Sequence, residues 1–102
     1  MFRLIKVTGE SLSPSFQEGD YVVVVTLPYI MRKIRRGDIV VFRQAEFGTM
    51  IKKVDYLDPD QGTVYVVGTH KDSVDSKRFG TISVQALIGK VIWRIPIPLY
   101  TE

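Results

Sequence analysis

Two residues of this 102-residue chain have side chains suited to act as a nucleophile and a base, Ser11 and Lys52. Ser11 lies in the segment Gly9-Glu10-Ser11-Leu12-Ser13-Pro14, shortly after an apolar run. A small residue two positions before the serine and a proline three positions after it indicate a tight turn that would expose the hydroxyl group. A hydroxyl at such a turn can attack a carbonyl carbon if a neighbouring base removes its proton.

Lys52 is the candidate base because of its neighbours in the apolar run 49–57. Successive side chains of a strand point to opposite faces, so Lys52 shares its face with alternate residues of the run. These residues are Met50, Val54 and Tyr56. A lysine held against apolar side chains loses hydration of its ammonium group, which lowers its pKa and makes the neutral amine available. Lys53 falls on the other, more polar face, and we expect it to be exposed.

An exposed serine and a desolvated lysine together predict a Ser–Lys dyad, in which the amine accepts the hydroxyl proton as Ser11 attacks. Each residue alone has a simpler interpretation. Ser11 also fits an ordinary serine-rich turn, and Lys52 also fits a lysine whose stem lies along the sheet while its amine reaches solvent. A Ser-His-Asp triad made from His70, Asp72 and Ser76 is disfavoured, because three residues so close in one turn seldom adopt that geometry.

The apolar runs predict strands rather than helices. Six short runs rich in Val, Ile, Phe and Tyr are separated by Gly, Pro or Asp, and they cover residues 2–7, 21–26, 38–43, 49–57, 63–67 and 88–95. Gly19-Asp20 and Gly37-Asp38 precede two of these runs, where glycine tolerates a positive φ. Single helical turns are expected at 13–17 and 84–87. The sequence thus predicts one compact, mostly antiparallel β domain spanning residues 1–102, with one or two short helical turns.

The composition excludes several classes of site. The chain has a net charge of +3, with 45% hydrophobic and 25% charged residues, which is ordinary for a globular domain. Its longest uninterrupted apolar stretch, Tyr21–Val25, is far shorter than the roughly 20 residues of a membrane-spanning helix. A sequence without cysteine has no disulfides or thiolate metal ligands, and a single histidine, His70, excludes a multi-histidine metal site. We therefore expect no metal and no cofactor.

The run Arg32-Lys33-Ile34-Arg35-Arg36 places four positive charges within five residues. Such a cluster could neutralise the phosphates of a nucleic acid or of an anionic membrane. Because no aromatic residues or nucleic-acid-binding motif accompany it, a solvated loop between two strands is the favoured interpretation. We expect no nucleic-acid partner.

Five segments carry recognisable motifs in one order along nearly the whole chain. The Ser11 segment, followed by Gly19-Asp20-Tyr21-Val22, resembles the Ser-Met-x-Pro…Gly-Asp-x-Val signature of type I signal peptidases. Ile51-Lys52-Lys53-Val54 is similar to the family's Ile-Lys-Arg-Val motif, and residues 68–80 resemble its Gly-Asp-Asn-x-x-x-Ser-x-Asp-Ser-Arg-x-x-Gly block. The second Gly-Asp strand and the closing strand of the family resemble Arg36–Phe42 and Ile88–Val91. The resemblance implies the coiled β catalytic core that signal peptidases share with LexA-type repressors.

The resemblance also implies roles for individual residues. Ser11 would be the nucleophile and Lys52 the general base, and Ser73 would hydrogen-bond to the lysine amine and orient it. The backbone N–H of Ser11 would donate to the oxyanion. Many relatives add a hydroxyl donor two positions before the nucleophile, where this chain has Gly9.

A structural brace is implied by the end of the same block. Asp75 and Lys77 stand where the family has an Asp and an Arg that support the site. Lysine offers a point charge where arginine offers a planar fork, so this brace would be looser, and Arg78 is the candidate to replace the arginine. Leu12 stands for the usual methionine, and Thr69-His70 stands for Asp-Asn.

Typical family members carry N-terminal transmembrane helices, whereas ten residues precede Ser11 here. The chain resembles the small members described as nickel-type superoxide dismutase maturation proteases. The resemblance implies a serine endopeptidase that binds a protein or leader peptide as an extended strand and cleaves it after small residues. We expect a cytoplasmic or peripheral membrane location, cytoplasmic favoured. Weak membrane contact would come from an apolar rim of Phe2, Leu4, Leu12 and Phe16.

Two other functions remain compatible with the sequence. A self-cleaving domain of the LexA type is disfavoured because no DNA-binding domain or cleavable linker is found upstream. A non-catalytic β module that binds peptides at a sheet edge fits Gly9 and the missing anchor. A lysine on an apolar stripe argues against that second alternative, because peptide binding does not require it.

Overall fold

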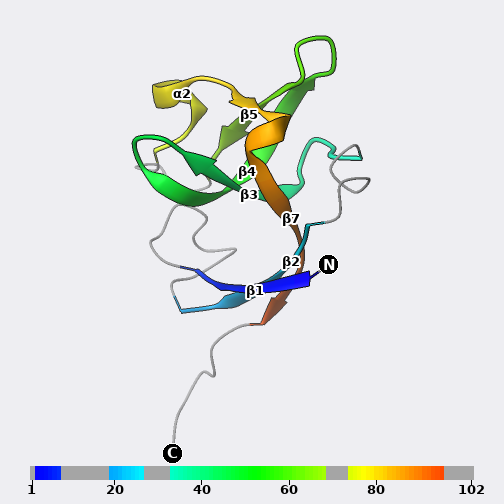
Figure 1. The fold of residues 1–102 in the computed structure, drawn as a ribbon, viewed down its shortest axis with the longest axis vertical. Helices are drawn as coiled ribbons and strands as arrows, with labels where there is room; N and C mark the ends of the chain where they lie inside the picture. Colours follow the sequence, from blue (N-terminus) through cyan, green and yellow to red (C-terminus); the bar gives the residue numbers. More distant parts are fainter. Residues whose placement is uncertain (1, 8–18, 27–32, 69–73, 96–102) are drawn as a thin grey trace, which may run out of the picture.

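A computed structural model describes residues 2–7, 19–26, 33–68 and 74–95. These residues form a single seven-stranded sheet with strand order β1-β2-β7-β3-β4-β5-β6, in which every pairing is antiparallel (Figure 1). The strands are β1 (Phe2–Lys6), β2 (Tyr21–Val25), β3 (Ile39–Gln44), β4 (Gly48–Asp58), β5 (Thr63–Val67), β6 (Ile82–Ser83) and β7 (Leu87–Ile95). Two short helices accompany them, α2 (Ser76–Phe79) and the 3₁₀ helix η1 (Val84–Ala86).

The central strand β3 separates two hydrophobic clusters. Alternate side chains of a strand face opposite sides, so Val40 and Phe42 enter one cluster while Val41 enters the other. The first cluster lies among β3, β4, β5 and β7, and its buried members are Ile34, Val40, Phe42, Val54, Val64, Val66, Ile82 and Leu87. The second joins β2, β3 and the residue directly after β1, and its buried members are Val7, Val22, Val24 and Val41. The long strand β7 pairs with both β2 and β3 and thereby connects the two halves of the sheet (Figure 1).

The predicted fold class is confirmed, because the described chain is mostly antiparallel β structure. All six predicted strands are present, with ends within one residue of the prediction. Gly19 (φ 95°) and Gly37 (φ 92°) have the positive φ that their turns were expected to require. The expected turn at 84–87 is the 3₁₀ helix η1, while the one at 13–17 lies outside the described residues. The helix α2 and the two-residue strand β6 were not predicted.

Among the described residues, no helix is long and apolar enough to cross a lipid bilayer.

Candidate active site around Lys52

Lys52 lies in the middle of β4, on the face that packs against the first hydrophobic cluster. It is paired with Val40 of β3, and Met50 and Val54 precede and follow it on the same face. Only 1% of the lysine is exposed, so its stem and amine are enclosed by the sheet and its neighbours. The prediction that Lys52 is buried on an apolar stripe is therefore confirmed.

Burial changes the acid–base behaviour of Lys52. Desolvation disfavours the charged ammonium and lowers the pKa of Lys52 below its ordinary value, while the negative charge of Asp75 opposes this by raising it. Because desolvation is the larger effect, a greater share of the amine is neutral near physiological pH than for a lysine in water. A neutral amine can accept a proton, which is the property required of a general base.

Asp75 is the charged partner of this site and is itself buried, with 4% exposed. It caps helix α2, accepting a hydrogen bond from the backbone N–H of Lys77 at 3.0 Å and another from the backbone N–H of Gly68 at 3.2 Å. Next to it, the buried Ser76 hydroxyl accepts a hydrogen bond from the N–H of Val66 at 2.9 Å. Two backbone amides, those of Val66 in β5 and of Gly68 directly after it, thus fix the start of α2 on β5, and the amide of Lys77 caps the helix itself.

The other two residues of the predicted brace, Lys77 and Arg78, belong to helix α2. Lys77 is exposed, and its backbone N–H rather than its ammonium contacts Asp75. Arg78 is also exposed, and its guanidinium carbon lies 5.4 Å from the centroid of the Phe47 ring. The hydrogen bonds to the Asp75 carboxylate from the described residues therefore come from main-chain amides, and that of Lys77 is one of the N–H groups left unpaired at the start of a helix.

The candidate residues Gly9, Ser11 and Ser73 lie outside the described residues, and so do Leu12 and Phe16 of the expected apolar rim. The described ends of their segments can be located. Val67 pairs with Lys53, so Gly68, from which the segment 69–73 departs, comes level with Lys52. At the other segment, the N–H of Gly19 donates to the carbonyl of Val7 at 2.9 Å, so the two described residues that flank 8–18 are hydrogen-bonded to each other.

Two exposure predictions for β4 need correction. Lys53 is partly buried rather than exposed, because its cross-strand neighbours Ile39 and Val67 lie on either side of it. Tyr56 is 50% exposed and not on the apolar face. The register of β4 with β5 shifts between Val54 and Tyr56, so the parity of the strand reverses there.

An ion pair between a buried aspartate and an arginine near the surface was missed by the sequence analysis. Asp20, which is fully buried, accepts a hydrogen bond at 2.7 Å from Nε of Arg94 near the end of β7. Its backbone carbonyl also accepts from the N–H of Val7 at 2.7 Å. The pair ties the closing strand to the start of β2. The acidic residue of the Gly-Asp motif was visible in the sequence, but its partner 74 residues later was not.

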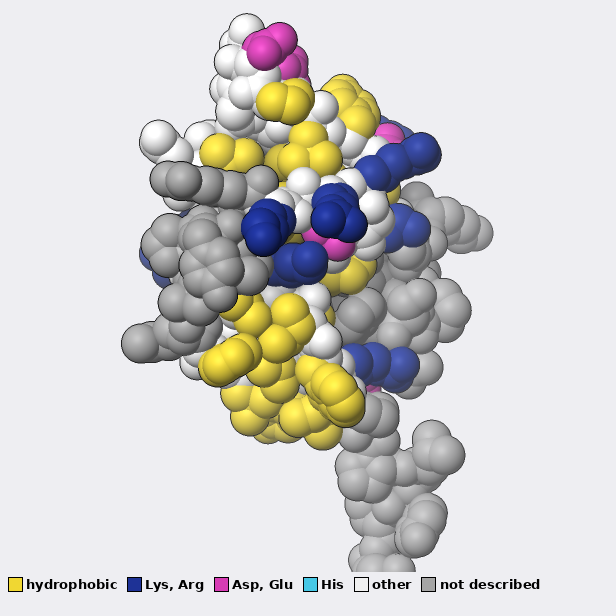
Figure 2. Space-filling view, turned by 90° about the vertical axis from the view of Figure 1, so that its right-hand side faces the viewer, with side chains coloured by type: hydrophobic (Ala, Val, Ile, Leu, Met, Phe, Trp, Pro, Cys, Tyr) yellow, Lys and Arg dark blue, Asp and Glu magenta, His cyan; other side chains and the backbone are white. Residues whose placement is uncertain are grey.

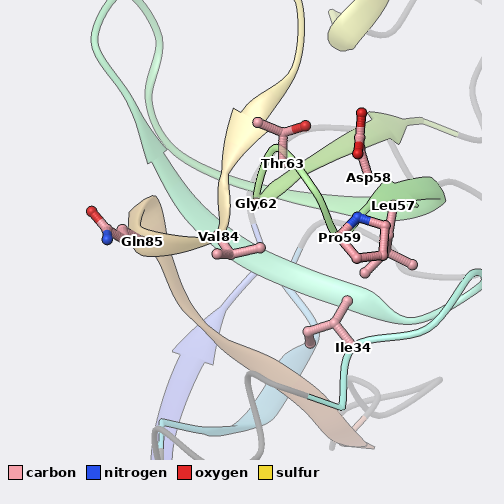
Figure 3. Close-up of a pocket in the computed structure, with 8 residues that line it drawn as sticks. All are labelled: Ile34, Leu57, Asp58, Pro59, Gly62, Thr63, Val84 and Gln85. Carbon is pink, nitrogen blue, oxygen red and sulfur yellow. The ribbon is translucent and has the colours of Figure 1, made fainter.

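A pocket of about 380 Å³ opens at the other end of β4, and it was also not predicted. Its apolar wall is formed by Ile34, Leu57, Pro59 and Val84, whose side chains are labelled around the pocket in Figure 3. Five residues of extended strand, about 17 Å, separate Leu57 from Lys52. The pocket is therefore remote from the candidate base. Among the described residues, no three His, Cys, Asp or Glu side chains are grouped so that they could hold a metal ion.

Comparison with known proteins places these observations in a family. A family model described as "Signal peptidase, peptidase S26" matches residues 1–61, which include Ser11 and Lys52. Signal peptidase I V of Bacillus subtilis (strain 168) is 39% identical over 49 residues, covering 48% of this chain and 29% of the relative. The chain thus spans less than a third of the length of the curated relative it matches.

Proposed function

The chain belongs to the signal peptidase family, peptidase S26, and on that premise we propose that it is a serine endopeptidase with Ser11 as nucleophile and Lys52 as general base. The observation that carries the proposal is the burial of Lys52, whose amine is desolvated among apolar side chains of the sheet. A buried lysine is costly for a fold, so its presence at the position of the family's base favours a chemical role.

The proposed reaction follows the chemistry of a Ser–Lys dyad. Neutral Lys52 accepts the proton of the Ser11 hydroxyl as its oxygen attacks the peptide carbonyl carbon, and the backbone N–H of Ser11 donates to the oxyanion. The lysine ammonium then gives its proton to the leaving amine. Water then gives a proton to the same neutral amine as its oxygen attacks the acyl carbon, and the ammonium returns that proton to the Ser11 oxygen as the acyl group leaves. In this proposal Ser73 orients the amine of Lys52. Gly9 has no side-chain hydroxyl, so any further hydrogen bond to the oxyanion comes from a backbone N–H group.

Asp75 supports this mechanism as a fixed negative charge beside the amine. By raising the pKa of Lys52 against the stronger effect of desolvation, it keeps the amine basic enough to take a proton from serine. In the proposed brace, Lys77 and Arg78 contribute as residues of α2, the helix that Asp75 caps.

The proposed substrate is a protein precursor or leader peptide bound as an extended strand, with small residues before the scissile bond. Strand β1 is an edge of the described sheet, and an edge offers unpaired backbone groups to which a peptide can add. The proposal requires no metal or cofactor.

Peripheral contact with a membrane is part of the proposal. Phe2 and Leu4 of β1 are 66% and 60% exposed, and Trp93 of β7 is 66% exposed. Val23 of β2 is paired with Leu4 of β1 on one side and with Trp93 of β7 on the other, so Leu4 and Trp93 lie in one row across the sheet. Figure 2 shows hydrophobic side chains gathered on the face at the level of these strands, with Lys and Arg side chains nearby. Such a surface favours weak, reversible contact with a bilayer. The expected cytoplasmic location stays a prediction.

A cleavage assay tests the function. Peptides with alanine or glycine before the scissile bond are incubated with the wild-type chain and with Ser11→Ala, Lys52→Ala and the double variant. We expect both single variants to lose cleavage and the double variant to be no worse, because the two residues act as one unit. Lys53→Ala, the matched control on the other face of β4, should keep most activity. Peptide binding without cleavage by the wild-type chain would instead identify a non-catalytic module, and cleavage of its own chain alone would identify a LexA-type domain.

A further inference from the structure

The tip of the β3–β4 hairpin lies on the same side of the molecule as helix α2 (Figure 1). Aromatic rings of the two elements contact each other. The Phe79 ring of α2 lies between two rings of the hairpin, with centroids 6.1 Å from Phe42 and 6.3 Å from Phe47. The guanidinium of Arg78 covers the Phe47 ring at 5.4 Å. Tilted rings at these separations and a cation over a ring face are both favourable arrangements. We call Phe47, Phe79 and Arg78 the aromatic clamp.

The hairpin side of the aromatic clamp is held in place by its own turn. The side-chain oxygen of Gln44 accepts hydrogen bonds from the backbone N–H groups of Glu46 and Phe47, each at 2.7 Å. Gly48 closes the turn with a φ of +80°, a conformation that favours glycine. Phe42 is fully buried in the first cluster. Phe47 is therefore presented to α2 from a fixed position.

Helix α2 depends on such contacts because it has only four residues. A helix of one turn has no stability of its own, so its position is set by what it packs against. Its start is bonded to β5 through the Ser76 hydroxyl, and its end is packed through Phe79. Asp75 immediately precedes it, and this carboxylate is the charge that acts on Lys52.

We propose that Phe47, Phe79 and Arg78 are positioning residues that hold α2 against the hairpin and so keep the Asp75 carboxylate beside Lys52. From β3, Lys52 faces the apolar Val40, so among the described residues Asp75 supplies the charge that acts on it. The consequence for catalysis rests on the proposed function, whereas the consequence for the lysine amine does not.

Loss of the aromatic clamp should change the pKa of Lys52 in the direction opposite to that caused by removing a positive charge from α2. Removing the positive charge of Arg78 would by itself raise the pKa of Lys52, because a repelling cation would be lost. Loosening α2 withdraws Asp75 and lowers the pKa of Lys52 instead. Phe47→Ala changes no charge and has the second effect alone.

The test is an NMR titration of the Lys52 amine in protein with isotope-labelled lysine, combined with the pH profile of peptide cleavage. Asp75→Asn, which keeps a helix-capping side chain, defines the full effect, a fall in the pKa of Lys52 caused by loss of the carboxylate charge. We expect Phe47→Ala and Arg78→Ala to lower the pKa of Lys52 by a smaller amount and to move the acidic limb of the cleavage profile to lower pH. Arg43→Ala, an exposed arginine of the same hairpin, is the matched control and should leave the pKa of Lys52 unchanged.

Three results would overturn the proposal. One is an unchanged pKa of Lys52 in Phe47→Ala; a second is a raised pKa in Arg78→Ala. The third is a fall in the pKa of Lys52 in Lys77→Ala as large as that in Arg78→Ala, which would assign the effect to the loss of any long side chain of α2 rather than to contact with Phe47. A wild-type chain that cleaves no peptide would contradict the proposed function, yet the titration would still decide whether the clamp acts on Lys52.

Discussion

Lys52→Met is expected to abolish cleavage while making the fold more stable. Methionine retains the length and apolar stem of lysine but has no amine, so it suits the buried site between Met50 and Val54. The lowered pKa of Lys52 means that folding opposes protonation of the amine. Each unit by which the folded pKa falls below that of the unfolded chain costs about 1.4 kcal/mol of stability when the lysine is protonated in the unfolded state.

The size of the effect depends on pH in a defined direction. Below the folded pKa of Lys52 the cost is complete, and it disappears as pH rises toward 10.5, the ordinary value at which the unfolded lysine also becomes neutral. Because Asp75 offsets part of the desolvation, we expect Lys52→Met to be more stable by on the order of 1 kcal/mol at pH 7. For a domain of this size that corresponds to a rise in Tm of roughly 4–8 °C.

Urea unfolding at pH 7 and near pH 10.5 measures this difference. The gap between Lys52→Met and the wild type should shrink at the higher pH, whereas Lys53→Met, on the other face of β4, should show no comparable pH-dependent gap. Lower stability of Lys52→Met at pH 7, or a gap that widens as pH rises, would mean that the ammonium is stabilised by Asp75 more than it is destabilised by burial.

Two further outcomes follow from the same structure. Cleavage by the wild-type chain should become faster from pH 6 toward pH 10, because only the neutral amine of Lys52 accepts the serine proton and its lowered pKa is passed in this range. A rate that falls steadily over that range in a fluorogenic peptide assay would contradict this. Gly89→Ala should destabilise the fold by about 1–3 kcal/mol in urea unfolding, because the added Cβ would lie 2.5 Å from the backbone oxygen of Val25 on the neighbouring strand. If the variant were as stable as the wild type, β2 and β7 could move apart at no cost, which would contradict this prediction.

The sequence was sufficient to predict the strands and the environment of Lys52, because both depend on the local alternation of apolar and polar residues. The same alternation failed at Tyr56, where one extra residue in β4 reverses the parity of the strand. Such a bulge depends on pairing with β5, so the composition of β4 alone could not show it. Likewise, Lys53 is covered by neighbours from two other strands.

Contacts between distant segments were the other features that the sequence could not predict. Helix α2 has weak local signals, since four residues carry too little pattern to be recognised, and it is held by Phe42, Phe47 and β5. The pairing of Asp20 with Arg94 joins residues 74 positions apart. The resemblance to signal peptidases supplied the role of Asp75, but its hydrogen bonds to main-chain amides, rather than to the ammonium group of Lys77, became visible only in the folded chain.

The most direct test of the Ser11–Lys52 dyad is to identify the residue that becomes acylated during cleavage. The chain is incubated with a peptide ester ending in alanine, quenched with acid, and mapped by tandem mass spectrometry. The proposal predicts an acyl group on Ser11 that forms far more slowly in Lys52→Met and at nearly the wild-type rate in Lys53→Met. An acyl group on another residue, or equal acylation of Ser11 in Lys52→Met, would contradict the proposed mechanism.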